Sequence, residues 1–217
     1  MNEDSAHRHS IFPNKISRIV LQALSDVLGA NDSNAVLTTA RLSHLIGGPL
    51  PADFEPGLTF AEAGRLFEAI EGIYGVQGGR RLSRQAGRES FKYWIEGFGS
   101  LIGLADLAFR ILPLAMRARI GLEVAAEILN RYSGQRVSLG EGHESYFFVL
   151  ETCGFCEGRR TEEPACAFPI GILEEMLFWV SRGRRFVVEE TTCIACGDPV
   201  CTLCIDKTPV DPASSER

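Results

Sequence analysis

The chain has 217 residues, with 22 Lys and Arg against 28 Asp and Glu, so its formal net charge is −6. Hydrophobic residues make up 45% and charged residues 23%, which is typical of a globular protein and excludes disordered, collagen-like and coiled-coil classes. The negative net charge disfavours bulk attraction to nucleic acid or to an anionic membrane, so we expect neither as a partner.

The first 134 residues have the pattern of helices. Apolar residues recur at helical spacing, Asn14 can cap the first helix, and Thr59 forms a capping box with Glu62 at the start of the third. Pro113 separates the last two helices. The predicted helices cover residues 14–29, 32–45, 59–73, about 80–97, 102–112 and 114–131.

The remaining sequence alternates between strand-like and helical segments. The predicted elements are strands at 135–139 and 146–151, a helix at 168–182, and strands at 185–190 and 200–206. Helices followed by hairpins predict an α+β fold, in which a helical part precedes an antiparallel sheet with a packed helix. We expect one domain at 13–207, divided into 13–134 and 135–207, with flexible tails at 1–12 and 208–217.

All the cysteines lie in the last third of the chain: Cys153, Cys156, Cys166, Cys193, Cys196, Cys201 and Cys204. An odd number confined to one region argues against a disulfide scaffold, which spreads its bridges across a fold. Residues 1–10 lack the pattern of a signal peptide, and the apolar run at 100–116 is broken by Asp106, Arg110 and Pro113. We therefore expect a cytoplasmic protein whose cysteines bind metal or carry out redox chemistry.

Three of these cysteines and one glutamate are placed to converge. Cys193 follows one predicted strand and Cys201 begins the next, so a hairpin brings the two together, and Glu190 lies three residues before Cys193. Cys166 lies just before the predicted helix at 168–182. Three thiolates and a carboxylate form a closed tetrahedral site suited to zinc, which is the expected cofactor of the part at 135–207. A closed site of this kind indicates a structural metal, so we expect no catalytic residue there.

The segment from Glu190 to Cys201, which reads E-T-T-C-I-A-C-G-D-P-V-C, resembles the signature of the 4-vinyl reductase domain. Cys166 is similar to a cysteine that this domain carries upstream. The pattern also resembles the zinc site of phenol-sensing transcription activators that contain the domain. The resemblance covers residues 135–207 and implies Cys166, Glu190, Cys193 and Cys201 as ligands, an antiparallel sheet, and a homodimer.

The chain also departs from the family pattern, because its extra cysteines form three CxxC pairs: Cys153 with Cys156, Cys193 with Cys196, and Cys201 with Cys204. Such pairs could form a four-cysteine site, hold a second metal or act as a redox pair. We interpret Cys204 as a buried strand residue that faces the core. For Cys153 and Cys156, a reduced pair near the surface and a functional role both stay open.

A run of aromatic and small residues between positions 91 and 112 is typical of helix packing, but it could also line a cavity for a flat hydrophobic ligand. The resemblance favours the cavity, because the family is known as a binding module for small aromatic or hydrocarbon-like molecules. It also implies a pocket aromatic about twenty residues before Cys166. The candidate ligand-binding residues are Trp94, Phe98, Phe109 and Tyr146.

Four basic residues recur every four positions along one predicted helix: Arg80, Arg84, Arg88 and Lys92. They could hold an anionic ligand or partner. We interpret them instead as a solvated helix face, because charged runs usually face water.

The sequence contains no dinucleotide, phosphate-loop or serine-hydrolase motif. We therefore expect a zinc-containing binding protein that acts as a sensor or carrier of a small hydrophobic or aromatic ligand. The alternative is a protein of bacteriochlorophyll or chlorophyll biosynthesis that assists or performs 4-vinyl reduction, as an oxidoreductase. A redox switch built on Cys153 and Cys156 is the third reading.

Overall fold

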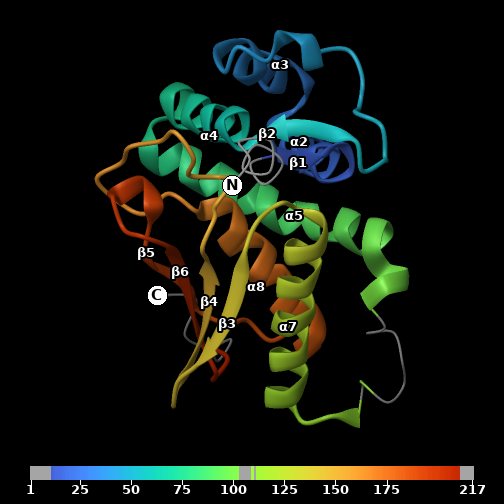
Figure 1. Ribbon diagram of the computed structural model, residues 1–217, viewed down its shortest axis with the longest axis vertical. Helices are drawn as coiled ribbons and strands as arrows, with labels where there is room; N and C mark the ends of the chain where they lie inside the picture. Colours follow the sequence, from blue (N-terminus) through green and yellow to red (C-terminus); the bar gives the residue numbers. More distant parts are fainter. Residues whose placement is uncertain (1–10, 103–108, 110, 211–217) are drawn as a thin grey trace, which may run out of the picture.

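Figure 1 shows the computed structural model of the chain, which describes residues 11–102, 109 and 111–210. Most residues of the predicted tails and of the predicted helix at 102–112 lie outside these ranges. Among the described residues, no helix combines the length and the apolarity needed to cross a bilayer.

The helical part forms, but several helix ends differ from the prediction, and Asn14 is the first residue of α2 rather than its N-cap. Its elements are α2 (Asn14–Leu28), α3 (Ala30–Thr39), η1 (Ser43–Leu45), α4 (Phe60–Tyr74), α5 (Val76–Ile102) and α7 (Leu114–Tyr132). The predicted capping box is confirmed, since the Thr59 hydroxyl accepts from the Glu62 backbone N–H at 3.2 Å and the Glu62 carboxylate accepts from the Thr59 N–H at 2.9 Å. Two short antiparallel strands, β1 (Ile11–Pro13) and β2 (Pro56–Thr59), were not predicted because strands of this length show no alternation.

A four-stranded antiparallel sheet follows the helices. It consists of β3 (Val137–Glu141), β4 (Ser145–Leu150), β5 (Val188–Thr192) and β6 (Cys201–Asp206), in the order β3-β4-β6-β5. In Figure 1 the sheet lies below α2, α3 and α4, and α5 crosses between these helices and α8 (Ala167–Ser181). The α+β fold with a helical part before an antiparallel sheet is therefore confirmed.

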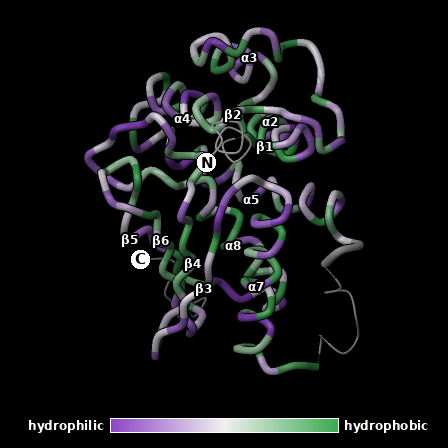
Figure 2. Tube along the Cα trace, in the orientation of Figure 1, coloured by the Kyte–Doolittle hydropathy of each residue, from purple (hydrophilic) through white to green (hydrophobic). Residues whose placement is uncertain are grey.

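Apart from Glu174 and Glu175, most side chains of helix α8 are apolar and most of its residues are buried, which is typical of a core helix. Figure 2 shows this hydrophobic stretch in green, between α5, α7 and the sheet. Two glycines allow α5 and α8 to cross closely. A Cβ on Gly171 would lie 2.0 Å from the Arg84 carbonyl oxygen, and one on Gly87 would lie 2.1 Å from the Phe168 carbonyl oxygen. One buried core runs from α2 through α5 and α8 to the inner face of the sheet.

The predicted basic face of α5 is not simply solvated. Arg84 and Arg88 both pair with Glu174, which is buried on α8, with Arg88 Nη2 at 2.8 Å from the carboxylate. Arg80 pairs with Glu163 at 2.7 Å. The interpretation as a solvated face was therefore incomplete, because the partners lie about 80 to 90 residues away in the sequence.

Candidate functional site: a cysteine cluster and an apolar cavity

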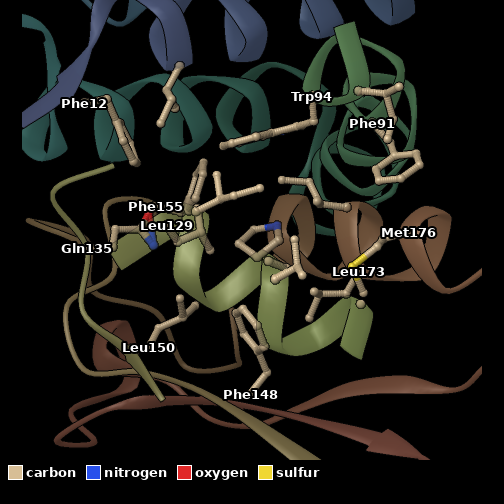
Figure 3. Close-up of a pocket in the computed structure, with 18 residues that line it drawn as sticks. Phe12, Phe91, Trp94, Leu129, Gln135, Phe148, Leu150, Phe155, Leu173 and Met176 are labelled. Atoms are coloured by element: carbon tan, nitrogen blue, oxygen red, sulfur yellow. The ribbon is translucent and has the colours of Figure 1, made fainter. Parts of the chain in front are cut away.

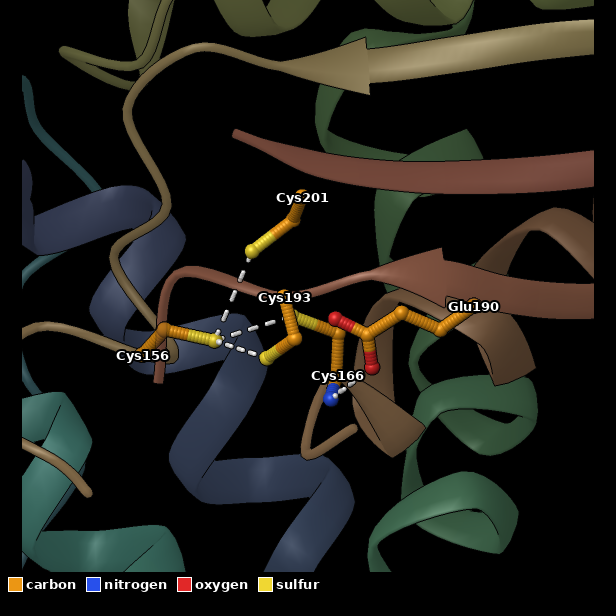
Figure 4. Close-up of side chains that lie close together, drawn as sticks. All are labelled: Cys156, Cys166, Glu190, Cys193 and Cys201. Carbon is orange, nitrogen blue, oxygen red and sulfur yellow. Dashed lines mark hydrogen bonds between the residues drawn. The ribbon is translucent and has the colours of Figure 1, made fainter. Parts of the chain in front are cut away.

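Four cysteines and one glutamate converge at one end of the sheet. Each offers one ligand atom, and these atoms all lie within 4.8 Å of one another. Figure 4 shows the side chains pointing toward one another from the β5 and β6 strands, the start of α8 and the loop after β4. The members of this cluster are Cys156, Cys166, Glu190, Cys193 and Cys201.

The spacing of the sulfur atoms is close to that of a tetrahedral thiolate site. Cys156 Sγ lies 3.6 Å from Cys193 Sγ and 3.7 Å from Cys201 Sγ. A metal–sulfur bond of about 2.3 Å in tetrahedral geometry separates the sulfur atoms by about 3.8 Å. The Cys156–Cys166 distance is shorter, at 3.0 Å. All four cysteines are buried, so the cluster is closed to solvent.

Glu190 contributes a carboxylate with one unsatisfied oxygen. Its Oε2 accepts a hydrogen bond from the Cys166 backbone N–H at 2.7 Å. Its Oε1 is buried and has no hydrogen-bond partner among the described residues. Burial raises the pKa of Glu190 to about 8. A buried oxygen without a partner is costly, and a cation at the cluster would satisfy it.

The thiols of the cluster differ in acidity. Hydrogen bonds from Cys156, and further ones from Cys166 and Cys201, lower the pKa of Cys193. The pKa of Cys166 is raised instead, first by its hydrogen bond with Cys153 and also by burial. Hydrogen bonds from the neighbouring thiols thus favour the thiolate at Cys193, which is the state in which a cysteine binds metal.

A buried arginine fixes the loop that supplies Cys156 and Cys166. Arg159 Nη2 lies 2.8 Å from Glu71 Oε1 on α4, and Arg159 Nη1 donates to the carbonyl oxygens of Phe155 and Ala165, both at 3.3 Å. The loop therefore takes one conformation because a helix of the other half of the fold holds it.

The structure brings together all four predicted ligands, Cys166, Glu190, Cys193 and Cys201, and it adds Cys156. The signal for Cys156 was its CxxC spacing, which could not show whether the pair was at the surface. Both Cys153 and Cys156 are buried, and Cys153 Sγ lies 3.3 Å from Cys166 Sγ, outside the group of converging ligand atoms.

The remaining two cysteines lie outside the cluster. Cys196 is exposed in η2 (Ile194–Cys196). The prediction that Cys204 faces the core was wrong, because Cys201, Leu203 and Ile205 alternate with it and take the buried face of β6. Cys204 is half-buried on the opposite face.

An apolar cavity lies between α5, α7, α8 and β4, apart from the cysteine cluster. Its free volume is about 70 Å³. Figure 3 shows aromatic and aliphatic side chains turned into it, with Gln135 as the polar residue of the wall. Two buried polar atoms of the wall have no hydrogen-bond partner among the described residues: Trp94 Nε1 and Gln135 Oε1.

The predicted ligand-binding residues are distributed unevenly around this cavity. Trp94 lines it, and Phe98 stacks on Trp94 from behind, with 5.2 Å between ring centroids. Phe109 and Tyr146 are buried but do not line it, and the Tyr146 hydroxyl donates to the Ala115 carbonyl oxygen at 3.3 Å. Sequence reasoning missed the contributions of α7 and α8, whose apolar faces carry no motif.

Solved structures with a similar fold include several H-NOX proteins. One Tt H-NOX variant has a TM-score of 0.55 at 16% identity, over 92% of this chain and 97% of that chain. An H-NOX protein from S. oneidensis in the Fe(II)NO ligation state has a TM-score of 0.55 at 11% identity, over 89% of this chain and 99% of that one. An Fe(II) unliganded H-NOX protein from K. algicida has a TM-score of 0.54 at 12% identity, over 89% and 96%.

No protein-family model matches the sequence, and no curated protein matches it. The structural likeness shows that the chain has the H-NOX fold, so the expectation of a 4-vinyl reductase domain was wrong. The expected role in bacteriochlorophyll biosynthesis was wrong for the same reason, because it depended on that domain. The expectation of zinc as cofactor was wrong on the same finding, because solved structures with this fold are described with heme or Fe(II). The short cysteine pattern misled because it fixes a local hairpin rather than a fold.

Proposed function

We propose that this protein is a binding protein, acting as a sensor or carrier, for a small and mostly apolar molecule held in the cavity between α5, α7 and α8. The observation that carries the proposal is the cavity itself, whose wall is aromatic and aliphatic except for Gln135. Ligand sites of small molecules are typically apolar with a few placed polar groups.

The two unpartnered polar atoms of the wall narrow the ligand class. Trp94 Nε1 can only donate a hydrogen bond, and Gln135 Oε1 can only accept one. A ligand with one hydroxyl group can satisfy either atom while its apolar part fills the cavity. The proposed ligand is therefore a small apolar molecule with a single hydrogen-bonding group.

The described residues do not fit heme at this cavity. Heme iron in proteins is held by His, Cys, Tyr or Met side chains. The wall offers none of the first three, its sole sulfur is the thioether of Met176, and it contains no basic residue to pair with the propionates. His44 lies in η1 and His143 in the turn between β3 and β4, both away from the cavity, and the other two histidines, His7 and His9, lie outside the described residues.

Filling the cavity tests the proposal. Ala125 of α7 lines the cavity, and Ala115 of the same helix is exposed. We expect phenol to raise the unfolding temperature of the parent and of the Ala115→Leu variant, and to have a much smaller effect on Ala125→Leu. Benzene, which lacks the hydroxyl, should bind more weakly than phenol. Equal shifts in both variants would place the ligand elsewhere and overturn the proposal.

A hemin titration tests the mismatch with heme. We expect no saturable one-to-one complex with a defined axial-ligand absorption spectrum. If such a complex forms and Met176→Leu abolishes it, the cavity is a heme site and the proposed direct binding of a small ligand is wrong.

The cysteine cluster supports a second, structural role. We infer that Cys156, Cys166, Cys193 and Cys201 hold one thiophilic metal ion, with Glu190 beside it. The near-tetrahedral sulfur spacing and the unsatisfied Glu190 oxygen support this site. The ion would join β5, β6 and the start of α8, which are otherwise connected at this end by loops. Elemental analysis of the purified protein identifies the ion.

A further inference from the structure

A second pocket lies in the helical part, between α2, α3 and the segment that follows η1. Its volume is about 320 Å³, within the range of about 300 to 1,000 Å³ that is usual for small-molecule sites. It shares no lining residue with the cavity of the proposed function. Leucines form most of its apolar wall: Leu21, Leu24, Leu28, Leu37, Leu45, Leu50 and Leu66.

Among the described residues, Arg18 is the one charged residue of the pocket wall. Its guanidinium is half-buried and donates one hydrogen bond, from Nη1 to the Leu50 carbonyl oxygen at 3.0 Å. Within the described ranges it forms no ion pair with a carboxylate. A half-buried guanidinium has five N–H donors and remains charged, so it is suited to bind a carboxylate of a ligand.

Ser33 supplies an independent sign of a ligand site. Ser33 lines the same pocket, and its Oγ is buried and has no hydrogen-bond partner among the described residues. No acidic side chain of the part of the chain that the structure describes lines the pocket. Asp32, the acidic neighbour of Ser33, accepts a hydrogen bond from Tyr74 at 2.6 Å and is not part of the wall. The pocket therefore combines a cation, an unsatisfied hydroxyl and a leucine-rich wall, with no competing negative charge.

We propose that this pocket binds an amphipathic monocarboxylate, with the carboxylate at Arg18 and the apolar chain along the leucines. Charge-assisted hydrogen bonds hold the head group, and burial of the chain supplies most of the remaining affinity. Ser33 would satisfy its hydroxyl with a polar atom of the ligand or with a water molecule carried by it. The site is distinct from the proposed cavity, so the protein could respond to two chemically different small molecules.

Calorimetric titration of the full chain with octanoate tests the proposal, with octanol as the neutral probe of similar length. We expect saturable one-to-one binding of octanoate, at least about tenfold weaker binding by Arg18→Gln, and little change in Arg18→Lys. Ser33→Ala should have a smaller effect. The matched control is Arg41→Gln, since Arg41 is an exposed arginine of the same helical part and does not line the pocket.

The outcomes separate this pocket from the cavity of the proposed function. Octanoate binding that is unchanged in Ala125→Leu and reduced in Arg18→Gln supports the proposal. Binding that Ala125→Leu abolishes and Arg18→Gln leaves intact would place octanoate in the other cavity and overturn the proposal. Equal affinity for octanoate and octanol, or no saturable octanoate binding, would overturn it as well. Urea denaturation of Arg18→Gln checks that this variant is folded.

Discussion

Arg159 and Glu71 form a buried ion pair, with Nη2 and Oε1 2.8 Å apart, between the cysteine-bearing loop and α4. The two residues are 88 positions apart in the sequence, and their side chains are 2% and 12% exposed. Since Arg159 also donates to two carbonyl oxygens of its own loop, this pair decides how the loop presents Cys156 and Cys166.

Removal of one partner of this pair should be costly. Glu71→Gln leaves the charge of Arg159 buried without its carboxylate, so we expect the free energy of unfolding to fall by about 3 kcal/mol. Urea denaturation measures it. Glu68→Gln, on the exposed side of α4, is the matched control and should have little effect. A loss below about 1 kcal/mol for Glu71→Gln would show that the pair does not fix the loop.

Replacement of glycine by alanine should have opposite effects on stability at two positions, one at the close crossing of α5 and α8 and one on an open face of α4. Gly171→Ala should destabilise the protein by about 1–3 kcal/mol, because its Cβ would lie 2.0 Å from the Arg84 carbonyl oxygen. Gly72→Ala, on an exposed position of α4 with nothing within 4 Å, should stabilise it by about 0.5–1 kcal/mol. Thermal unfolding of both variants compares them directly. An unchanged unfolding temperature in Gly171→Ala would contradict the close crossing of α5 and α8.

The cysteine cluster predicts that the neighbouring thiols of Cys153 and Cys156 differ in their importance for metal binding. Cys156 lies within the group of converging ligand atoms and Cys153 does not. Mass spectrometry under native conditions should therefore find the metal ion in Cys153→Ser and in the control Cys204→Ser, and its loss in Cys156→Ser. If Cys153→Ser loses the ion and Cys156→Ser retains it, the assignment of Cys156 as a ligand is wrong.

The capping box at the start of α4 predicts a modest loss of stability when Thr59 is replaced. Thr59→Ala removes the acceptor of the Glu62 backbone N–H, so we expect a loss of about 1 kcal/mol in the free energy of unfolding. Thr39→Ala is the control, because the Thr39 hydroxyl is exposed and bonds only a carbonyl oxygen of its own helix. If the free energy of unfolding fell equally in Thr59→Ala and Thr39→Ala, the loss of the cap would not explain the effect of Thr59→Ala.

Much of the fold was predictable because its signals are local. Helical spacing of apolar residues, the capping box of Thr59 and the turn at Gly142 between β3 and β4 each depend on residues a few positions apart. The α+β order follows from them. The ends of α3 and α5 shifted by several residues from the prediction, since tertiary packing rather than propensity decides where a helix ends.

Cysteine spacing similarly indicated that Cys166, Glu190, Cys193 and Cys201 could meet, because a hairpin joins β5 and β6 whatever surrounds it. The same spacing suggested the wrong family, since a dozen residues at one end of a hairpin do not determine how the helices are arranged around the sheet. It could not decide between Cys153 and Cys156 either, because that depends on how their loop packs against β5, β6 and the start of α8.

The sequence by itself determined an α+β chain of ordinary charge and composition, with cysteines grouped for metal or redox chemistry. Only the tertiary structure decided which thiols converge, where the apolar cavity lies and that Arg18 is half-buried without a carboxylate partner among the described residues. The physical reason is that these features arise between elements far apart in the chain. Burial and unsatisfied hydrogen-bonding groups become visible only when those elements are packed together.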